Sequence, residues 1–169
     1  SGKATQAQPV LEQLVGEQPN NLAALEGLAQ VQIAGGNSAG ALQTAATLQA
    51  MQPRSAKGYQ LAGKAFASSG KLDDARAAFE RAAELDPQWA EPVFALVGLD
   101  LLDKQPAIAL ARLDQADKRM PRDPMIKGAR GDALMFMGRY QDAIGSYRAA
   151  VDARPSWGQA YRGLAGAYT

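Results

Sequence analysis

Five prolines recur along the 169-residue chain at a constant spacing of 34 residues. They are Pro19, Pro53, Pro87, Pro121 and Pro155, in the local sequences GEQPN, AMQPR, ELDPQ, KRMPR and DARPS. Each proline follows an Ala- or Leu-rich stretch and precedes another. A fixed period of this size indicates a repeat protein, in which each repeat is one supersecondary unit that buries its apolar face against its neighbours.

The residues between the prolines are spaced for helices. From Ala56 to Trp89, apolar residues recur at helical spacings that put them on one face of each of two helices: Tyr59, Ala62 and Phe66, then Ala75, Phe79 and Ala82. Gly63 and Ala75 are small enough to let the two helices approach closely. Gly70 follows the first helix, where a left-handed residue is favoured, and Asp73 can cap the second. Each repeat is therefore expected to be a helix–turn–helix.

The period, the small and large positions and the closing proline resemble the tetratricopeptide repeat (TPR) family. A second copy has Gly131 and Leu134, then Ala143, Tyr147 and Ala150, then Pro155, and weaker copies start at Leu22 and Ala90. The resemblance covers the whole chain. It implies an all-α fold, a right-handed TPR superhelix (α-solenoid) of stacked antiparallel helix pairs.

This register divides the chain into four full repeats and two partial ones, forming a single TPR domain over 1–169. The partial repeats are a second helix (1–21) and a first helix (158–169), and the full repeats are 22–55, 56–89, 90–123 and 124–157. Because both ends fall in mid-repeat, we expect a fragment of a longer array. Ten helices are expected, near 5–16, 22–35, 38–51, 55–69, 72–85, 89–103, 106–119, 124–137, 140–153 and 157–168.

The composition excludes several classes of function. The chain has no Cys and no His, so thiolate nucleophiles, zinc fingers and imidazole acid–base catalysis are ruled out. The net charge of +1 does not favour nucleic-acid binding. The longest apolar run, FALVGLDLL, is too short to span a membrane. We therefore expect no enzyme activity, no cofactor, no metal and no direct membrane insertion.

Two glycine-rich stretches look like ligand loops but have simpler explanations. GYQLAGKAF (58–66) is one residue short of the phosphate-binding motif GxxxxGK[ST], because Ala65 stands where Ser or Thr is required. In the repeat register it is also helical, so its N–H groups are used within the helix. AGGNSAG (34–40) falls where the second repeat turns between its helices.

The resemblance implies a protein-interaction scaffold, with the first helix of each repeat lining a concave groove. A partner peptide or helix is expected to bind there, and this groove is polar in its first part and apolar in the middle. The predicted partner-binding residues are Gln60, Lys64, Glu91, Phe94, Leu101, Met125, Asp132, Met135 and Arg162. The Lys/Asn pairs with which chaperone-binding TPR proteins hold a carboxylate are missing, which argues against chaperone tails as partners.

Two charged residues depart from the repeat pattern. Asp100 stands where an aromatic residue is usual, and Arg130 where Leu is usual. Since a buried charge is far less costly when it is paired, we predict a structural ion pair between Asp100 and Arg130. The alternatives are two exposed residues on a distorted repeat, or a polar anchor for the partner.

The wider biological setting is expected only by analogy. The Ala-, Gln- and Arg-rich style resembles bacterial envelope scaffolds of exopolysaccharide secretion or pilus assembly, and the lack of Cys suits the periplasm rather than the cytoplasm. One alternative is an oligosaccharide-binding periplasmic module using Trp89 and Trp157, although capping and packing also explain these residues. The other is a structural array that self-associates weakly through its open ends.

Overall fold

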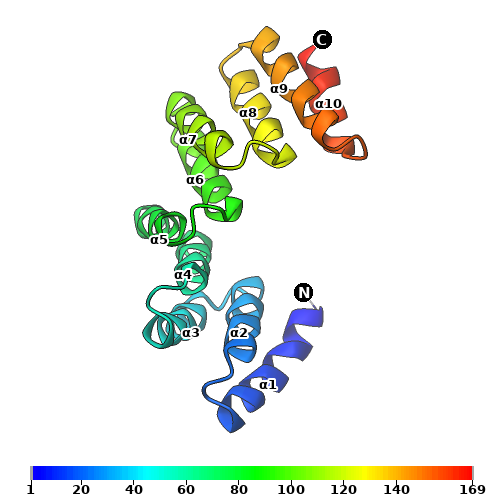
Figure 1. Cartoon of the computed structure of the whole chain (residues 1–169). Coiled ribbons are helices and arrows are strands. Elements are labelled where there is room, and N and C mark those ends of the chain that lie inside the picture. The colour runs from blue at the N-terminus through cyan, green and yellow to red at the C-terminus, as the bar shows by residue number, and fades with distance from the viewer. Residues whose placement is uncertain (1, 169) are drawn as a thin grey trace. The chain divides into compact units, whose positions relative to one another are not determined.

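A computed structural model of the chain describes the backbone of residues 2–168 and the side chains of residues 7–168 (Figure 1). Residues 2–168 form ten α-helices and no strand. The helices are α1 (Gly2–Glu17), α2 (Leu22–Ala34), α3 (Ser38–Met51), α4 (Ala56–Ser68), α5 (Leu72–Leu85), α6 (Ala90–Leu102), α7 (Pro106–Arg119), α8 (Pro124–Phe136), α9 (Tyr140–Ala153) and α10 (Gly158–Ala167). The all-α solenoid fold predicted from the sequence is confirmed. Every predicted boundary lies within one residue of the observed one, except that α1 begins three residues earlier than expected.

The chain divides into two compact units, residues 1–86 and 87–169. In the first unit each helix from α1 to α5 packs against the next, and in the second unit the same holds from α6 to α10. Alternate helices also contact each other, α2 with α4, α6 with α8, and α8 with α10. Each unit is therefore a local stack of antiparallel helices, and the candidate site lies entirely within the second unit.

Side-chain caps fix where several helices begin. Asn21 Oδ1 accepts the Ala24 N–H at 3.1 Å at the start of α2, and Asp123 Oδ1 accepts the Met125 N–H at 2.8 Å at the start of α8. These bonds satisfy backbone donors that have no partner within the helix. The first helix of a repeat thus starts just after the turn that the recurring proline sets.

The turns inside the repeats depend on a left-handed residue. Gly36, Gly70 and Gly138 have φ values of 79°, 78° and 70° at the same repeat position. Lys104 occupies that position between α6 and α7 with φ 57°, the one non-glycine residue with positive φ in the described backbone. A side chain at such a position costs about 1 kcal/mol or more relative to glycine, so the fold holds this turn against the preference of its residue.

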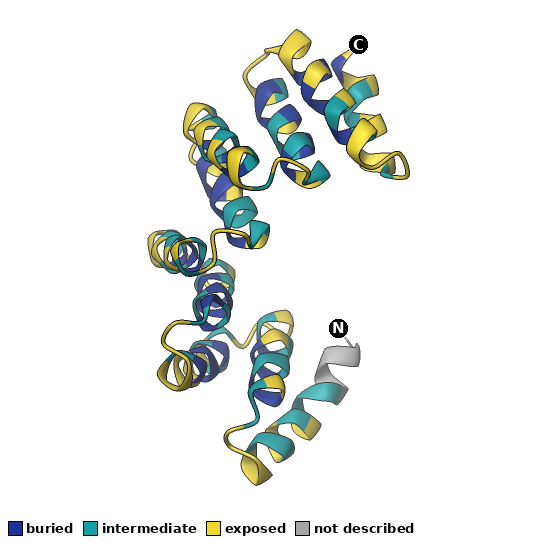
Figure 2. Ribbon diagram, viewed as in Figure 1, coloured by how far each residue is buried: buried dark blue, intermediate teal, exposed yellow. Residues whose placement is uncertain are grey.

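The close helix crossing predicted at Gly63 is confirmed. A Cβ on Gly63 would lie 2.5 Å from Phe79 Cε1, so the Phe79 ring of α5 lies directly against the backbone of α4. The core of the first unit continues through the buried side chains of Leu25, Leu48 and Leu61. Helix faces that carry these residues are the buried stripes drawn in Figure 2.

The second unit repeats the same crossing with a tyrosine. A Cβ on Gly131 would lie 2.6 Å from Tyr147 Cε1, so the Tyr147 ring of α9 covers the backbone of α8. Leu134 is fully buried in the same core cluster as Tyr147, and Leu113 and Ile126 are fully buried in a second cluster of this unit. In the part of the chain that the structure describes, no helix is long and apolar enough to cross a membrane.

Candidate partner-binding site

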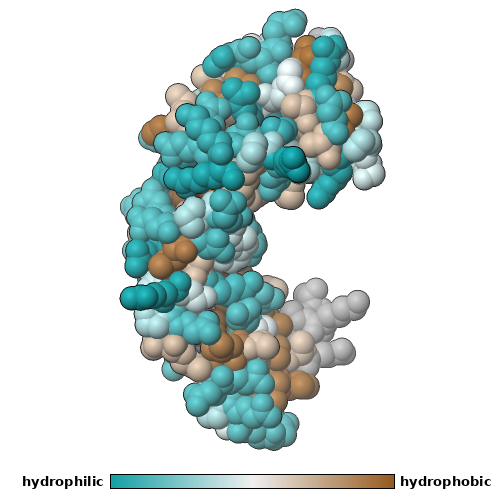
Figure 3. Space-filling view, viewed as in Figure 1, coloured by the Kyte–Doolittle hydropathy of each residue, from teal (hydrophilic) through white to brown (hydrophobic). Residues whose placement is uncertain are grey.

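One apolar cavity gathers four of the predicted groove residues in the second unit. Phe94 and Leu101 of α6, and Met125 and Asp132 of α8, line it together with Val97, Gly98, Ala129, Trp157 and Gln159. We call it the Phe94 cavity. Its volume is about 290 Å³, close to the lower limit of small-molecule pockets. On the face drawn in Figure 3, hydrophobic residues lie in patches among hydrophilic ones.

Trp157 forms part of the cavity wall because Gly128 leaves space for its ring. A Cβ on Gly128 would lie 2.6 Å from Trp157 Cη2, so the six-membered ring of the indole lies against the backbone of α8. From the sequence, Trp157 was explained by capping and packing and was not included in the predicted site. The sequence signal that could have identified Trp157 is its combination with Gly128, a glycine at a groove-facing position, because Trp157 directly precedes α10, the first helix of the following repeat.

Gly98 opens directly into the cavity. It lies in the interior of α6, and a Cβ built on it would meet no atom within 4 Å. A glycine inside a helix costs about 0.8–1.0 kcal/mol relative to alanine, and here packing does not require it. The glycine keeps open a space that any larger side chain would fill.

Asp132 is the charged residue in the cavity wall. The phenol of Tyr147 donates a hydrogen bond of 2.6 Å to Asp132 Oδ1, which holds the carboxylate in place. Burial of the phenol, and then the bond to Asp132, raise the pKa of Tyr147 above its ordinary value. Tyr147 therefore stays neutral at physiological pH and acts as a hydrogen-bond donor without charge.

The remaining predicted groove residues lie outside this cavity. Met135 is half-buried and packs against the core of the second unit, whereas Glu91 on α6 and Arg162 on α10 are exposed. In the first unit Lys64 is half-buried on α4. Gln60 was expected on the groove surface but is only 1% exposed, and its side-chain N and O atoms have no hydrogen-bond partner.

The predicted pairing of Asp100 with Arg130 is wrong in its partners. Arg112 Nε of α7 donates to Asp100 Oδ2 at 2.8 Å, and Asp100 is fully buried. Arg130 Nε donates instead to Asp114 Oδ1 at 2.7 Å. Helix α7 packs against both α6 and α8. It therefore presents Arg112 to α6 and Asp114 to α8. Both charged residues are paired through α7, so no direct pair between Asp100 and Arg130 forms.

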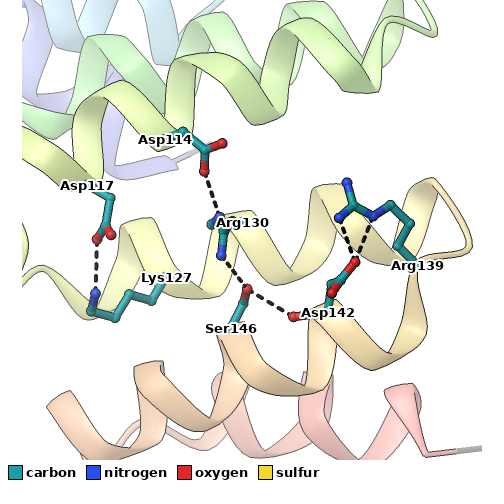
Figure 4. A network of polar contacts seen from close by, with 7 residues as sticks. All are labelled: Asp114, Asp117, Lys127, Arg130, Arg139, Asp142 and Ser146. Atoms are coloured by element: carbon teal, nitrogen blue, oxygen red, sulfur yellow. Dashed lines mark hydrogen bonds and ion pairs between the residues drawn. The ribbon is translucent and has the colours of Figure 1, made fainter.

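Arg130 belongs to a polar network on α7, α8 and α9 (Figure 4). Its Nη1 donates to Ser146 Oγ at 3.3 Å, while Lys127 pairs with Asp117 at 2.9 Å and Arg139 with Asp142 at 2.6 Å. The network lines a second cavity, of about 270 Å³, which also contains Gly145. We call it the polar cavity. Because its cations already have carboxylate partners, it has little capacity left for an anionic ligand.

The glycine-rich stretches have the structural roles expected of them. GYQLAGKAF lies within α4, where its N–H groups belong to a helix, so it cannot form a phosphate loop. Gly35 and Gly36 form the turn from α2 to α3. Among the described residues, no group of three or more acidic residues is placed to hold a metal ion.

Models of one family match most of the chain. Tetratricopeptide-repeat models match residues 1–65, 56–89, 100–156 and 129–169. The chain belongs to the TPR family.

One curated relative is the cytochrome c-type biogenesis protein CycH of Pseudomonas aeruginosa strain PAO1. It is 33% identical over 112 residues, which cover 62% of this chain and 26% of that protein. The chain therefore spans about a quarter of the length of this curated relative.

Solved structures share the fold. The thermophilic TPR protein TTC0263 of Thermus thermophilus superposes with a TM-score of 0.77 at 25% identity, covering 99% of this chain and 91% of its own. YrrB, described as a TPR protein with an unusual peptide-binding site, superposes with a TM-score of 0.65 at 18% identity, covering 94% and 81%. At that identity the YrrB likeness shows the fold alone.

Proposed function

We propose that the second unit binds a segment of a partner polypeptide in the Phe94 cavity, as the recognition site of a non-enzymatic scaffold. The observation that carries the proposal is Gly98, a helix-interior glycine that faces the empty part of an apolar cavity. TPR proteins are scaffolds for protein–protein interaction, and this cavity is lined mainly by apolar side chains.

The cavity wall is built for side chains of varied shape. Phe94, Leu101 and Trp157 offer apolar area, and Met125, whose exposed fraction is 44%, is flexible enough to adapt to different ligands. Gln159 and Asp132 add polar groups at the same cavity. An apolar centre with a few polar groups is the usual composition of a recognition site.

The setting of this scaffold is proposed from the relatives. The name of the curated relative, a cytochrome c-type biogenesis protein, supports a role in assembling c-type cytochromes. The peptide-binding site for which YrrB is described supports a polypeptide ligand. The bacterial periplasm is our proposed compartment, because the absence of cysteine suits an oxidising environment. Exopolysaccharide-secretion and pilus machines are the alternative settings.

Filling the cavity tests the proposal. Gly98 lines the Phe94 cavity and Gly145 the polar cavity, and at both positions a Cβ would meet no atom within 4 Å, so Gly98→Leu and Gly145→Leu form a matched pair. Peptides selected from a random library on the unmodified chain should bind Gly98→Leu about tenfold or more weakly, a loss of about 1.4 kcal/mol. Binding to Gly145→Leu should be unchanged. Equal binding of the selected peptides to both variants would locate their site elsewhere.

A glycan ligand is the second candidate, favoured by the position of Trp157 beside Asp132 and Gln159 in one cavity. Aromatic faces with polar groups at their edge suit sugar rings as well as side chains. A glycan array probed with the unmodified chain and with Gly98→Leu separates the two ligands. Glycan binding that Gly98→Leu abolishes, without any selected peptide, would support this candidate instead.

Self-association is the third candidate, favoured by Tyr161 and Tyr168 of α10, which are 48% and 58% exposed. Light scattering over a range of protein concentrations measures it directly. A mass that rises with concentration and returns to that of one chain in Tyr161→Ser would support an array.

A further inference from the structure

We propose that the Phe94 cavity selects a basic side chain of the partner, an arginine or a lysine, with Asp132 as its counter-ion. This inference rests on the proposed function, since it names the residue that the same cavity receives. It is carried by the position of Asp132 at an apolar cavity without a cation, in contrast to four aspartates of the same unit that are each paired with one.

The second unit provides a cation for aspartates on both sides of Asp132 in the sequence. Asp100, Asp114, Asp117 and Asp142 each have an Arg or Lys nitrogen within 2.9 Å. Asp132 has none in the described part of the chain, where its one interaction is with the neutral phenol of Tyr147. Its negative charge is therefore held in position and left uncompensated at the cavity.

The bond from Tyr147 also determines which atom is available. It engages Oδ1 of Asp132 at 2.6 Å, so Oδ2 is left to accept a hydrogen bond from a ligand. A charge-assisted bond to this oxygen is roughly twice as strong as a neutral one. An acidic ligand would instead face a like charge, and Asp132 would disfavour it.

The rest of the cavity matches the stem of a basic side chain. Phe94, Leu101 and Met125 can cover methylene groups, as apolar surfaces do for Lys and Arg elsewhere. The indole of Trp157 is the aromatic group that attracts a cation most strongly. Arginine satisfies both features, because its planar guanidinium can stack on an aromatic ring and donate to a carboxylate.

Arginine and its neutral isostere citrulline provide a direct test. The probes are Nα-acetyl-arginine N-methylamide and the corresponding citrulline derivative, which differ in charge and hardly in shape. Their binding is followed by the indole N–H signal of Trp157 in a Trp89→Phe background, which leaves Trp157 as the only tryptophan. The arginine probe should bind about fivefold more tightly than the citrulline probe. High salt should reduce this ratio.

The variants assign the preference to Asp132. Asp132→Asn keeps the acceptor for Tyr147 and removes the charge, so the ratio should fall to about one while the citrulline probe binds as before. Asp142→Asn, which neutralises an aspartate of the polar cavity, is the matched control and should keep the ratio. Circular dichroism checks that both variants are folded.

The outcomes separate the two proposals. If selected peptides bind in a Gly98→Leu-sensitive way but arginine and citrulline bind equally, the basic preference is overturned and the proposed function stands. A preference that survives in Asp132→Asn also overturns it. If neither probe nor any selected peptide binds the cavity, both proposals fail.

Discussion

Mutation of glycine to alanine should have opposite effects on the free energy of unfolding at two positions of the second unit. Gly98 and Gly131 both lie inside first helices of repeats, yet the Cβ of an alanine would meet open space at Gly98 and the Tyr147 ring at Gly131. Gly98→Ala should raise the free energy of unfolding by about 0.5–1 kcal/mol, because alanine has the higher helix propensity.

Gly131→Ala carries the same helix-propensity gain but should be destabilising overall. With its Cβ 2.6 Å from Tyr147 Cε1, the ring must shift. Overpacking of this kind costs about 1–3 kcal/mol. The shift also strains the 2.6 Å bond to Asp132, and bonds to charged groups contribute about 1.5–3 kcal/mol. The expected net loss is about 1–3 kcal/mol, so the two variants should differ by about 1.5–4 kcal/mol.

Urea unfolding followed by tryptophan fluorescence measures this difference. Both tryptophans, Trp89 and Trp157, belong to the second unit, so the signal reports on that unit specifically. The midpoints should move in opposite directions with unchanged slopes. A lower midpoint for Gly98→Ala would show that the space beside Gly98 is not open. A higher midpoint for Gly131→Ala would show that the Tyr147 ring does not pack closely against Gly131.

Three further predictions concern buried polar groups. Gln60→Leu should stabilise the chain by about 1–3 kcal/mol in thermal unfolding, because it removes two buried polar atoms that lack partners; a loss of stability would show that the amide has a partner. Arg112→Met should cost about 3–5 kcal/mol in urea unfolding, since it removes the cation paired with buried Asp100, whereas Arg112→Met with Asp100→Leu should recover most of that loss; a double variant as unstable as the single one would contradict this. The pKa of Tyr147 is raised in the folded chain, so this phenol ionises at a lower pH in the unfolded chain. The contribution of Tyr147 to the free energy of unfolding is therefore complete below about pH 10 and is lost as the pH rises further. Unfolding midpoints measured across alkaline pH should fall less steeply in Tyr147→Phe, and equal slopes would rule out this role.

The sequence was sufficient to predict the helices because the information about them is local and repeated. The proline period sets where each repeat ends, and small residues such as Gly63 mark the crossings, so the helix limits follow from spacing alone. The early start of α1 is the exception. Pro9 lies inside this helix, and the repeat pattern does not constrain the residues that precede Pro9.

The site was less predictable, because repeat position does not determine which neighbour a long side chain reaches. Asp100 and Arg130 both depart from the pattern, but each pairs with a residue of α7 that the pattern leaves unspecified. Trp157 is part of the cavity only because Gly128, 29 positions earlier, has no side chain. Relations of this kind depend on three-dimensional packing, which the spacing of residues within a repeat does not encode.

The lysine in the α6–α7 turn has an implication for how this array tolerates sequence change. Lys104 keeps a conformation that the other repeats assign to glycine, and the repeat around it nevertheless retains its core. An array that absorbs such a local penalty has a margin of stability above the threshold for folding. The same margin of stability tolerates Gly98, which lowers the helix propensity of α6 although packing does not require a glycine there. The turn between the two helices of a repeat therefore does not require glycine for that repeat to pack, so this position is open to residues with side chains.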